Sequence, residues 1–178
     1  MFKLKKLSTK EICTIAMLIA LTAILGFVSG KLRIGTFSKF SFNFISVYFT
    51  AVLFGPFVAG FVGIVGDFIS AIGTGPYLWM IGLIEFVYGF IFGILFYNKS
   101  NKKTKGFVLK ALAATIIIAA VDIFAKSFIL LQVGYAPSPI NVAILTRLPM
   151  IAVMSVIRFV VLIIIEKGLA RVLNTVRQ

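Results

Sequence analysis

Long apolar segments recur along this chain, and they constrain its fold more than any other feature. The segment 12–28 is one example, and an α-helix needs about 20 apolar residues to cross the hydrocarbon core of a bilayer. Hydrophobic residues make up 61% of the chain, charged residues only 13%, and the mean hydropathy is +1.12. A soluble domain is about half apolar and about a quarter charged. The sequence therefore predicts an all-α membrane protein.

The apolar segments and the turns between them predict a bundle of six transmembrane helices. Gly-Pro pairs mark two of the turns, because Gly commonly ends a helix and Pro suits the first turn of the next. We expect a single integral-membrane domain over residues 1–178, because almost nothing is left for a soluble domain. The predicted helices cover approximately 9–29, 42–54, 56–72, 77–97, 107–133 and 141–165.

The distribution of Lys and Arg predicts the orientation of this bundle. The chain has a net charge of +13, and its basic residues gather at the N-terminus, in the loop 98–106 and in the C-terminal tail. The turns 73–76 and 134–139 contain no basic residue. Cytoplasmic segments of membrane proteins are enriched in Lys and Arg. We therefore expect both termini in the cytoplasm.

The external segment 30–41 breaks this charge bias, since it carries Lys31, Arg33 and Lys39. Phe residues alternate with these cations and continue into the next helix. One interpretation is a solvated loop beside an interfacial aromatic belt. The other is a binding lip for an anionic aromatic solute, in which cations hold carboxylates and Phe rings stack on a flat ring. On the second interpretation Arg33, Lys39 and Phe42 are candidate binding residues.

Charged residues inside the predicted helices are the other candidates, because a charge in the membrane is costly and usually functional. Asp122 and Lys126 are four residues apart, so mutual pairing is the structural alternative to a ligand role. We take Asp67, Lys126 and Arg147 as candidate ligand contacts, and expect Arg158 to be structural or to contact a partner. The full set is Asp67, Glu85, Asp122, Lys126, Arg147 and Arg158.

Tyr77 and Trp79 begin the fourth predicted helix at its external end. Aromatic residues at this depth usually anchor a helix at the membrane interface. The alternative is that both rings form a wall of a ligand cavity. The pattern alone leaves the two roles open.

Several functional classes lack the motifs they need. The chain has no Walker A sequence, no G-x-S-x-G or H-E-x-x-H motif and no His, so neither ATP hydrolysis by that route nor His-based zinc chemistry is expected. Its one cysteine, Cys13, excludes a disulfide within the chain. We therefore expect no catalytic residue, no metal and no cofactor.

Several motifs together resemble the substrate-binding S components of energy-coupling factor (ECF) vitamin transporters. They are the strip of small residues at Ala16 and Ala20, the Leu-Phe-Gly-Pro block at 53–60, the Gly-Asp pair that ends 62–67, and the Gly-Pro-Tyr sequence at 75–77. The series is most similar to the folate-specific branch. Such a resemblance implies a protein of a prokaryotic plasma membrane that captures its vitamin from outside.

The resemblance also implies partners and roles. An S component associates with a membrane coupling subunit and two ATPase subunits, whose ATP hydrolysis drives uptake, and it docks through the small-residue strip of its first helix. That assigns docking to Ala16, Ala20 and Ala23. For folate, ring stacking, recognition of the pterin N–H groups and binding of the glutamate would fall to Phe42, Tyr77, Trp79, Asp67, Arg33, Lys39, Lys126 and Arg147.

Other functions stay open on the sequence. The first is an S component for another flat vitamin or precursor, such as riboflavin, thiamin or a queuosine precursor. A small channel or structural subunit is the second. A membrane-embedded enzyme acting on lipid head groups would need a cluster of metal-binding carboxylates, whereas the five acidic residues here are spread along the chain.

Overall fold

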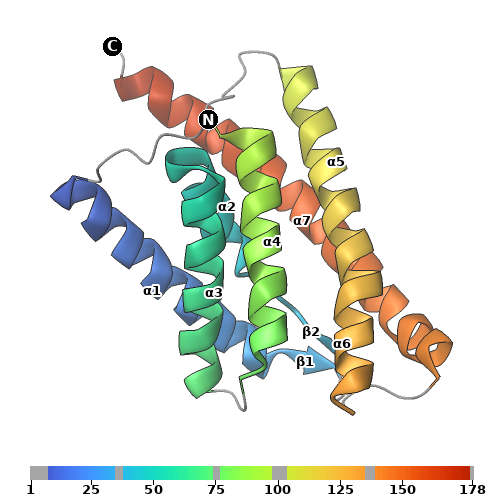
Figure 1. Ribbon diagram of the computed structural model, residues 1–178. Coiled ribbons are helices and arrows are strands. Elements are labelled where there is room, and N and C mark those ends of the chain that lie inside the picture. The colour runs from blue at the N-terminus through green and yellow to red at the C-terminus, as the bar shows by residue number, and fades with distance from the viewer. Residues whose placement is uncertain (1–7, 35–37, 74–76, 98–103, 135–138, 177–178) are drawn as a thin grey trace.

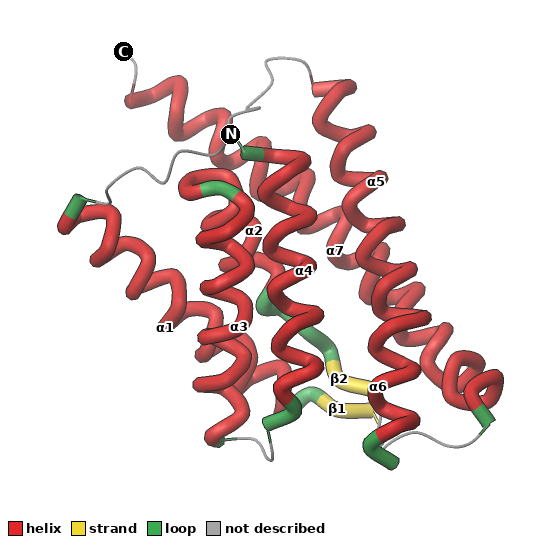
Figure 2. Tube along the Cα trace, viewed as in Figure 1, coloured by secondary structure: helices red, strands yellow, loops and turns green. Residues whose placement is uncertain are grey.

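The computed structural model describes residues 8–34, 38–73, 77–97, 104–134 and 139–176. Helices dominate it, and two very short strands form a hairpin (Figures 1 and 2). The elements are α1 (Thr9–Lys31), β1 (Arg33–Ile34), β2 (Ser38–Lys39), α2 (Phe44–Phe54), α3 (Pro56–Ile72), α4 (Trp79–Phe96), α5 (Thr104–Val121), the π-helical segment η1 (Asp122–Lys126), α6 (Ser127–Gln132) and α7 (Ile140–Val176).

The helices form one elongated bundle whose two ends differ (Figure 1). The start of α1 and the end of α7 lie toward one end, and the β1–β2 hairpin lies at the other, where α3 ends and α4 begins. Helix α3 packs between α1 and α4 and also contacts α2. Helix α7 runs along α5, η1 and α6. The hairpin and the α3–α4 connection therefore share one end of the molecule.

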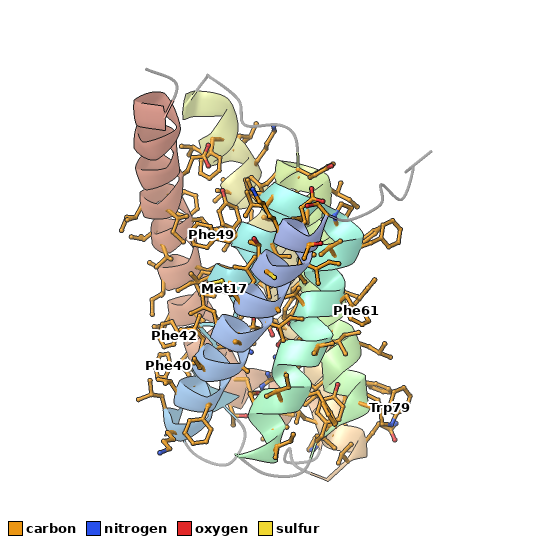
Figure 3. All side chains as sticks on the ribbon, turned by 90° about the vertical axis from the view of Figure 1, so that its left-hand side faces the viewer. Met17, Phe40, Phe42, Phe49, Phe61 and Trp79 are labelled. Atoms are coloured by element: carbon orange, nitrogen blue, oxygen red, sulfur yellow. The ribbon has the colours of Figure 1, made fainter. Side chains whose placement is uncertain are left out.

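Four described segments are long and apolar enough to cross a membrane. Helices α2 and α3, with 11 and 17 residues, are shorter than that. Large apolar side chains such as Met17 and Phe61 point away from the bundle in Figure 3 and are mostly exposed. An exposed apolar surface of this kind suits a lipid environment, which confirms the predicted helical membrane protein. The four segments are Thr9–Lys31, Trp79–Phe96, Gly106–Gln132 and Ile140–Glu166.

The observed helices follow the predicted ones closely, with three differences. The predicted helix 107–133 contains the π-helical segment η1. The last helix continues to Val176, beyond its predicted end at 165. Residues 33–34 and 38–39 form a hairpin in which Arg33 pairs with Lys39, and the sequence did not predict it because strands of two residues are too short to show an alternating pattern.

Glycine residues bring α3 and α4 unusually close together. A Cβ atom placed on Gly89 would lie 2.5 Å from the carbonyl carbon of Ala59 and from the amide nitrogen of Gly60. A Cβ atom on Gly93 would overlap the backbone of Pro56. Small residues allow membrane helices to approach at backbone distance. Gly89 and Gly93 therefore allow the backbones of α3 and α4 to meet.

Aromatic packing fills the interior between α2 and α4. Tyr48 is fully buried, and its ring meets Phe92 and Phe96 edge-on, with centroids 5.9 and 5.2 Å away. Its hydroxyl donates a hydrogen bond to Glu166 at 3.1 Å. A buried phenol needs such an acceptor, so this bond ties α2 to the later part of α7.

Gly89→Ala should destabilise the bundle, because the obstructing atoms belong to the α3 backbone and cannot rotate away. We expect a loss of about 1–3 kcal/mol, as for other overpacked sites, measured by unfolding of the purified protein in detergent. Gly168→Ala is the matched control, since no described atom lies within 4 Å of its added Cβ. Equal stability of the two variants would contradict the close α3–α4 contact.

Candidate functional site

Charged side chains from three elements meet inside the bundle. Lys126 of η1 lies 3.6 Å from Glu85 of α4 and 3.6 Å from Asp122, and Arg158 of α7 lies 3.6 Å from the other oxygen of Asp122. Glu85, Lys126 and Arg158 are all buried. The predicted pairing of Asp122 with Lys126 is confirmed. We call the group the buried charge network; its members are Glu85, Tyr88, Asp122, Lys126, Ser127, Arg147 and Arg158.

Asp122 receives most of the contacts in this network. Its Oδ1 accepts a hydrogen bond of 2.6 Å from the Tyr88 hydroxyl. The Lys126 ammonium also lies 5.6 Å from the centre of the Tyr88 ring, and the Arg158 guanidinium lies 6.0 Å from it. Attraction between cations and a ring face adds to the ion pairs. Tyr88 therefore contributes both its hydroxyl and its ring to holding the charges.

Arg147 enters the network from the first half of α7. Its Nη1 donates to the Ser127 hydroxyl at 2.7 Å and to the main-chain carbonyl of Asp122 at 3.5 Å. Arg147 and Arg158 thus both contact Asp122 of η1. The Nε atoms of both arginines have no hydrogen-bond partner among the described residues. Two buried N–H donors are therefore available to an acceptor that the described residues do not supply.

The π-helical segment η1 explains why these groups meet. A π-helix bonds residue i to i+5 and is wider than an α-helix, and such turns are frequent at functional sites. Here η1 begins at Asp122 and ends at Lys126. The Ser127 hydroxyl also lies 3.5 Å from the Asp122 carbonyl. This irregularity leaves no signal in the sequence, because a single wide turn does not disturb the apolar pattern of the helix.

Cations outnumber carboxylates in the buried charge network. Among its described members, Lys126, Arg147 and Arg158 face only Glu85 and Asp122. Uncompensated charge is expensive in an apolar interior. With the two unpartnered Nε–H groups, this excess suits a ligand that brings an anion or strong hydrogen-bond acceptors. The described residues hold no group of three or more potential metal ligands.

Two other predicted residues lie on the α3 side of α4. Asp67 is 5% exposed on α3. Tyr77 is half-buried just before α4, and its ring meets Phe68 edge-on with centroids 5.0 Å apart. Its hydroxyl occupies the space that a side chain at Gly82 would fill. Tyr77 is thus held against the bundle rather than directed into bulk solvent.

The start of α2 contributes a residue that the sequence analysis missed. Asn43 is 2% exposed, and its Oδ1 has no hydrogen-bond partner among the described residues. Phe42 beside it is half-buried, packs against the core, and donates its backbone N–H to the Ser29 hydroxyl at 3.0 Å. Asn43 is a single amide within a Phe-rich segment, so no repeating pattern in the sequence indicates its burial.

The remaining predicted binding residues are placed less centrally. Arg33 and Lys39 oppose each other in the hairpin backbone, but their side chains lie outside the described structure. Trp79 is 62% exposed, and in Figure 3 it points away from the bundle. This placement favours the interfacial anchor over the cavity wall for Trp79.

The predicted docking strip divides along α1. Ala16 and Ala20 are exposed, whereas Ala23 is buried within the bundle. Only the first two therefore offer a small-residue surface to another helix. Ala23 lies instead in the part of α1 that packs on the bundle.

The family model described as ECF-type riboflavin transporter, S component, matches residues 6–171. The chain belongs to this family of ECF S components. It is 33% identical over 144 residues to the folate transporter FolT of Streptococcus mutans, with 76% of this chain and 74% of that protein covered. The predicted family resemblance is confirmed, and the S component is a transport protein and not an enzyme.

A solved structure supports the same assignment. The crystal structure of FolT bound with folic acid has a TM-score of 0.66 to this S component and is 26% identical. The match covers 88% of this chain and 91% of that one. The helical S-component fold therefore extends over most of the molecule.

Arg158→Met should lower the stability of the S component. Removing one partner of a buried ion pair leaves the other incompletely compensated, at a cost of roughly 3 kcal/mol. Arg158→Lys, which keeps the charge, should lose less. Unfolding in detergent measures both, and a methionine variant as stable as the wild type would show that the Arg158–Asp122 pair contributes nothing.

Proposed function

We propose that this S component captures folate from outside the cell for ATP-driven uptake. The observation that carries the proposal is the 33% identity to a folate transporter over three quarters of this chain. The likeness to FolT bound with folic acid supports it. The chemistry of the interior is compatible, since folate carries two carboxylates and the buried charge network has an excess of cations.

The proposed binding residues follow from the parts of folate. Phe42 and Tyr77 would stack on the pterin and aminobenzoyl rings. Asp67 would accept the adjacent N–H groups of the pterin. Lys126 and Arg147 would bind a carboxylate through charge-assisted hydrogen bonds. Arg33 and Lys39 are proposed contributors at the outer rim of the same site, whereas the outward placement of Trp79 removes it from this set.

Riboflavin is the second candidate, because the matching family is described as that of the riboflavin transporter S component. A flavin and a pterin both offer a flat ring for aromatic stacking, but only the pterin presents adjacent N–H donors to Asp67. Riboflavin carries no charge that could offset the excess of cations in the buried charge network. The network therefore favours folate over riboflavin.

We propose that the chain forms a single domain over residues 1–178 that crosses the plasma membrane of a prokaryotic cell six times. The bundle ends support this, since α1 begins and α7 ends toward the same end (Figure 1). In the sequence, the basic segments directly precede α1, precede α5 and follow the apolar part of α7, which favours placing both termini in the cytoplasm. The hairpin would then face outward, where the vitamin arrives.

Docking to a coupling subunit that carries two ATPase subunits completes the proposal. Ala16 and Ala20 are exposed on the first half of α1. Small residues four apart let a second helix approach closely. We place the coupling subunit on this face, with Ala23 supporting α1 from inside.

Arg147→Ala should weaken folate binding by about 1.5–3 kcal/mol, which is about 10- to 150-fold, as for loss of a charge-assisted hydrogen bond. Isothermal titration of the purified variants with folate measures the change. Lys10→Ala, which removes an exposed cation at the start of α1, is the matched control. Unchanged affinity in the Arg147 variant would remove this residue from the site.

Ala16→Phe should abolish folate uptake while leaving binding to the purified S component intact, because bulk on the strip blocks helix docking. Met17→Phe adds bulk to the neighbouring, 73% exposed position and serves as control. Uptake is measured in cells that also produce the coupling and ATPase subunits. Normal uptake by the Ala16 variant would show that this face does not dock.

A further inference from the structure

Asp122 stands at the centre of the buried charge network, yet neither the predicted site nor the proposed function gives it a role. Its Oδ1 accepts the Tyr88 hydrogen bond at 2.6 Å and lies 3.6 Å from Lys126, and its Oδ2 lies 3.6 Å from Arg158. Both carboxylate oxygens are therefore engaged by side chains of this chain. A ligand would have to displace one of them to reach Asp122.

We propose that Asp122 is a positioning residue for the vitamin site. It holds the Lys126 ammonium and the Arg147 guanidinium in the orientation in which they bind the ligand, and it contacts no ligand atom itself. This inference rests on the proposed function for the location of the site. The proposed function names residues that bind the vitamin, whereas this inference concerns a residue that does not touch the vitamin but sets the geometry of those that do.

The two cations are held by different parts of Asp122. Lys126 meets the carboxylate at 3.6 Å, whereas Arg147 donates to the main-chain carbonyl at 3.5 Å. Both groups belong to the first residue of the π-helical turn. One residue therefore fixes the spacing between two cations that come from different elements.

Positioning matters here because the cations would otherwise separate. Lys126, Arg147 and Arg158 carry like charges, and repulsion between like charges is strong in an apolar interior. Lysine is also a long and flexible side chain that loses much rotamer freedom when it binds. The Asp122 carboxylate among the three cations reduces their repulsion and restricts the Lys126 side chain before the ligand arrives. Reducing such costs in advance is the basis of preorganised binding.

The alternative is that Asp122 only stabilises the bundle, with no effect through Lys126. A double-mutant cycle in folate affinity separates the two, because residues that act as a unit give non-additive effects. The four proteins are the wild type, Asp122→Asn, Lys126→Met and the double variant. Titration of each purified protein with folate gives the affinities.

We expect Asp122→Asn to weaken folate binding about tenfold and the double variant to bind within about threefold of Lys126→Met, since coupling in such networks is large. The positioning role is overturned if Asp122→Asn binds folate as the wild type does. It is equally overturned if the two single effects multiply in the double variant.

Glu166→Gln is the matched control, since it makes the same chemical change at a carboxylate that accepts from Tyr48 and is outside the network. It should keep the wild-type affinity. If Asp122→Asn does not fold, Tyr88→Phe replaces it, because it removes one donor to Asp122 and no charge. It should weaken folate binding in the wild type and leave the Lys126→Met protein unaffected; equal losses in both backgrounds would overturn the proposal.

Failure of the proposed function would be seen in the wild type itself, before any variant is compared. A wild type that binds riboflavin and not folate ends the folate assignment, and the same cycle in riboflavin affinity then tests Asp122. Nuclear magnetic resonance of arginine-labelled protein tests it without ligand. Asp122→Asn should shift the Nε–H signals of Arg147 and Arg158, and Glu166→Gln should not. Unshifted signals in the Asp122 variant would overturn the positioning role.

Discussion

The interior of this S component depends on charges that compensate one another in an apolar bundle. Each buried ion of the network would be costly alone, because apolar surroundings solvate a charge poorly. Asp122 reduces that cost for Lys126 and Arg158 together, at 3.6 Å from each. The network joins α4, η1 and α7. The interactions that stabilise the polar interior therefore also hold these helices together.

Close helix contacts on the other side of α4 give this network a fixed support. A Cβ atom on Gly63 of α3 would lie 2.8 Å from the backbone carbonyl of Glu85. The turn of α4 that carries Glu85 and Tyr88 is therefore pressed against the α3 backbone. Close packing of α3 against this turn of α4 thus helps to hold its polar groups in place, which suits a binding site that needs fixed geometry.

Much of this organisation follows from the sequence. Apolar length and Gly-Pro turns placed the helices, and the i, i+4 spacing of Asp122 and Lys126 predicted their pairing, because both depend on local pattern. The contacts of Arg147 and Arg158 with Asp122 were not predicted, since they depend on the π-helical turn. Asn43 was missed because a single amide in an aromatic segment gives no pattern, and the exposed placement of Trp79 depends on how α4 faces the bundle.

The central claim is that the cargo of this S component is folate. Binding of tritiated folate to the purified wild-type protein, with unlabelled riboflavin as competitor, tests it most directly. The account predicts saturable folate binding that unlabelled folate displaces and riboflavin does not. Absence of folate binding, or its displacement by riboflavin at comparable concentration, would contradict the assignment.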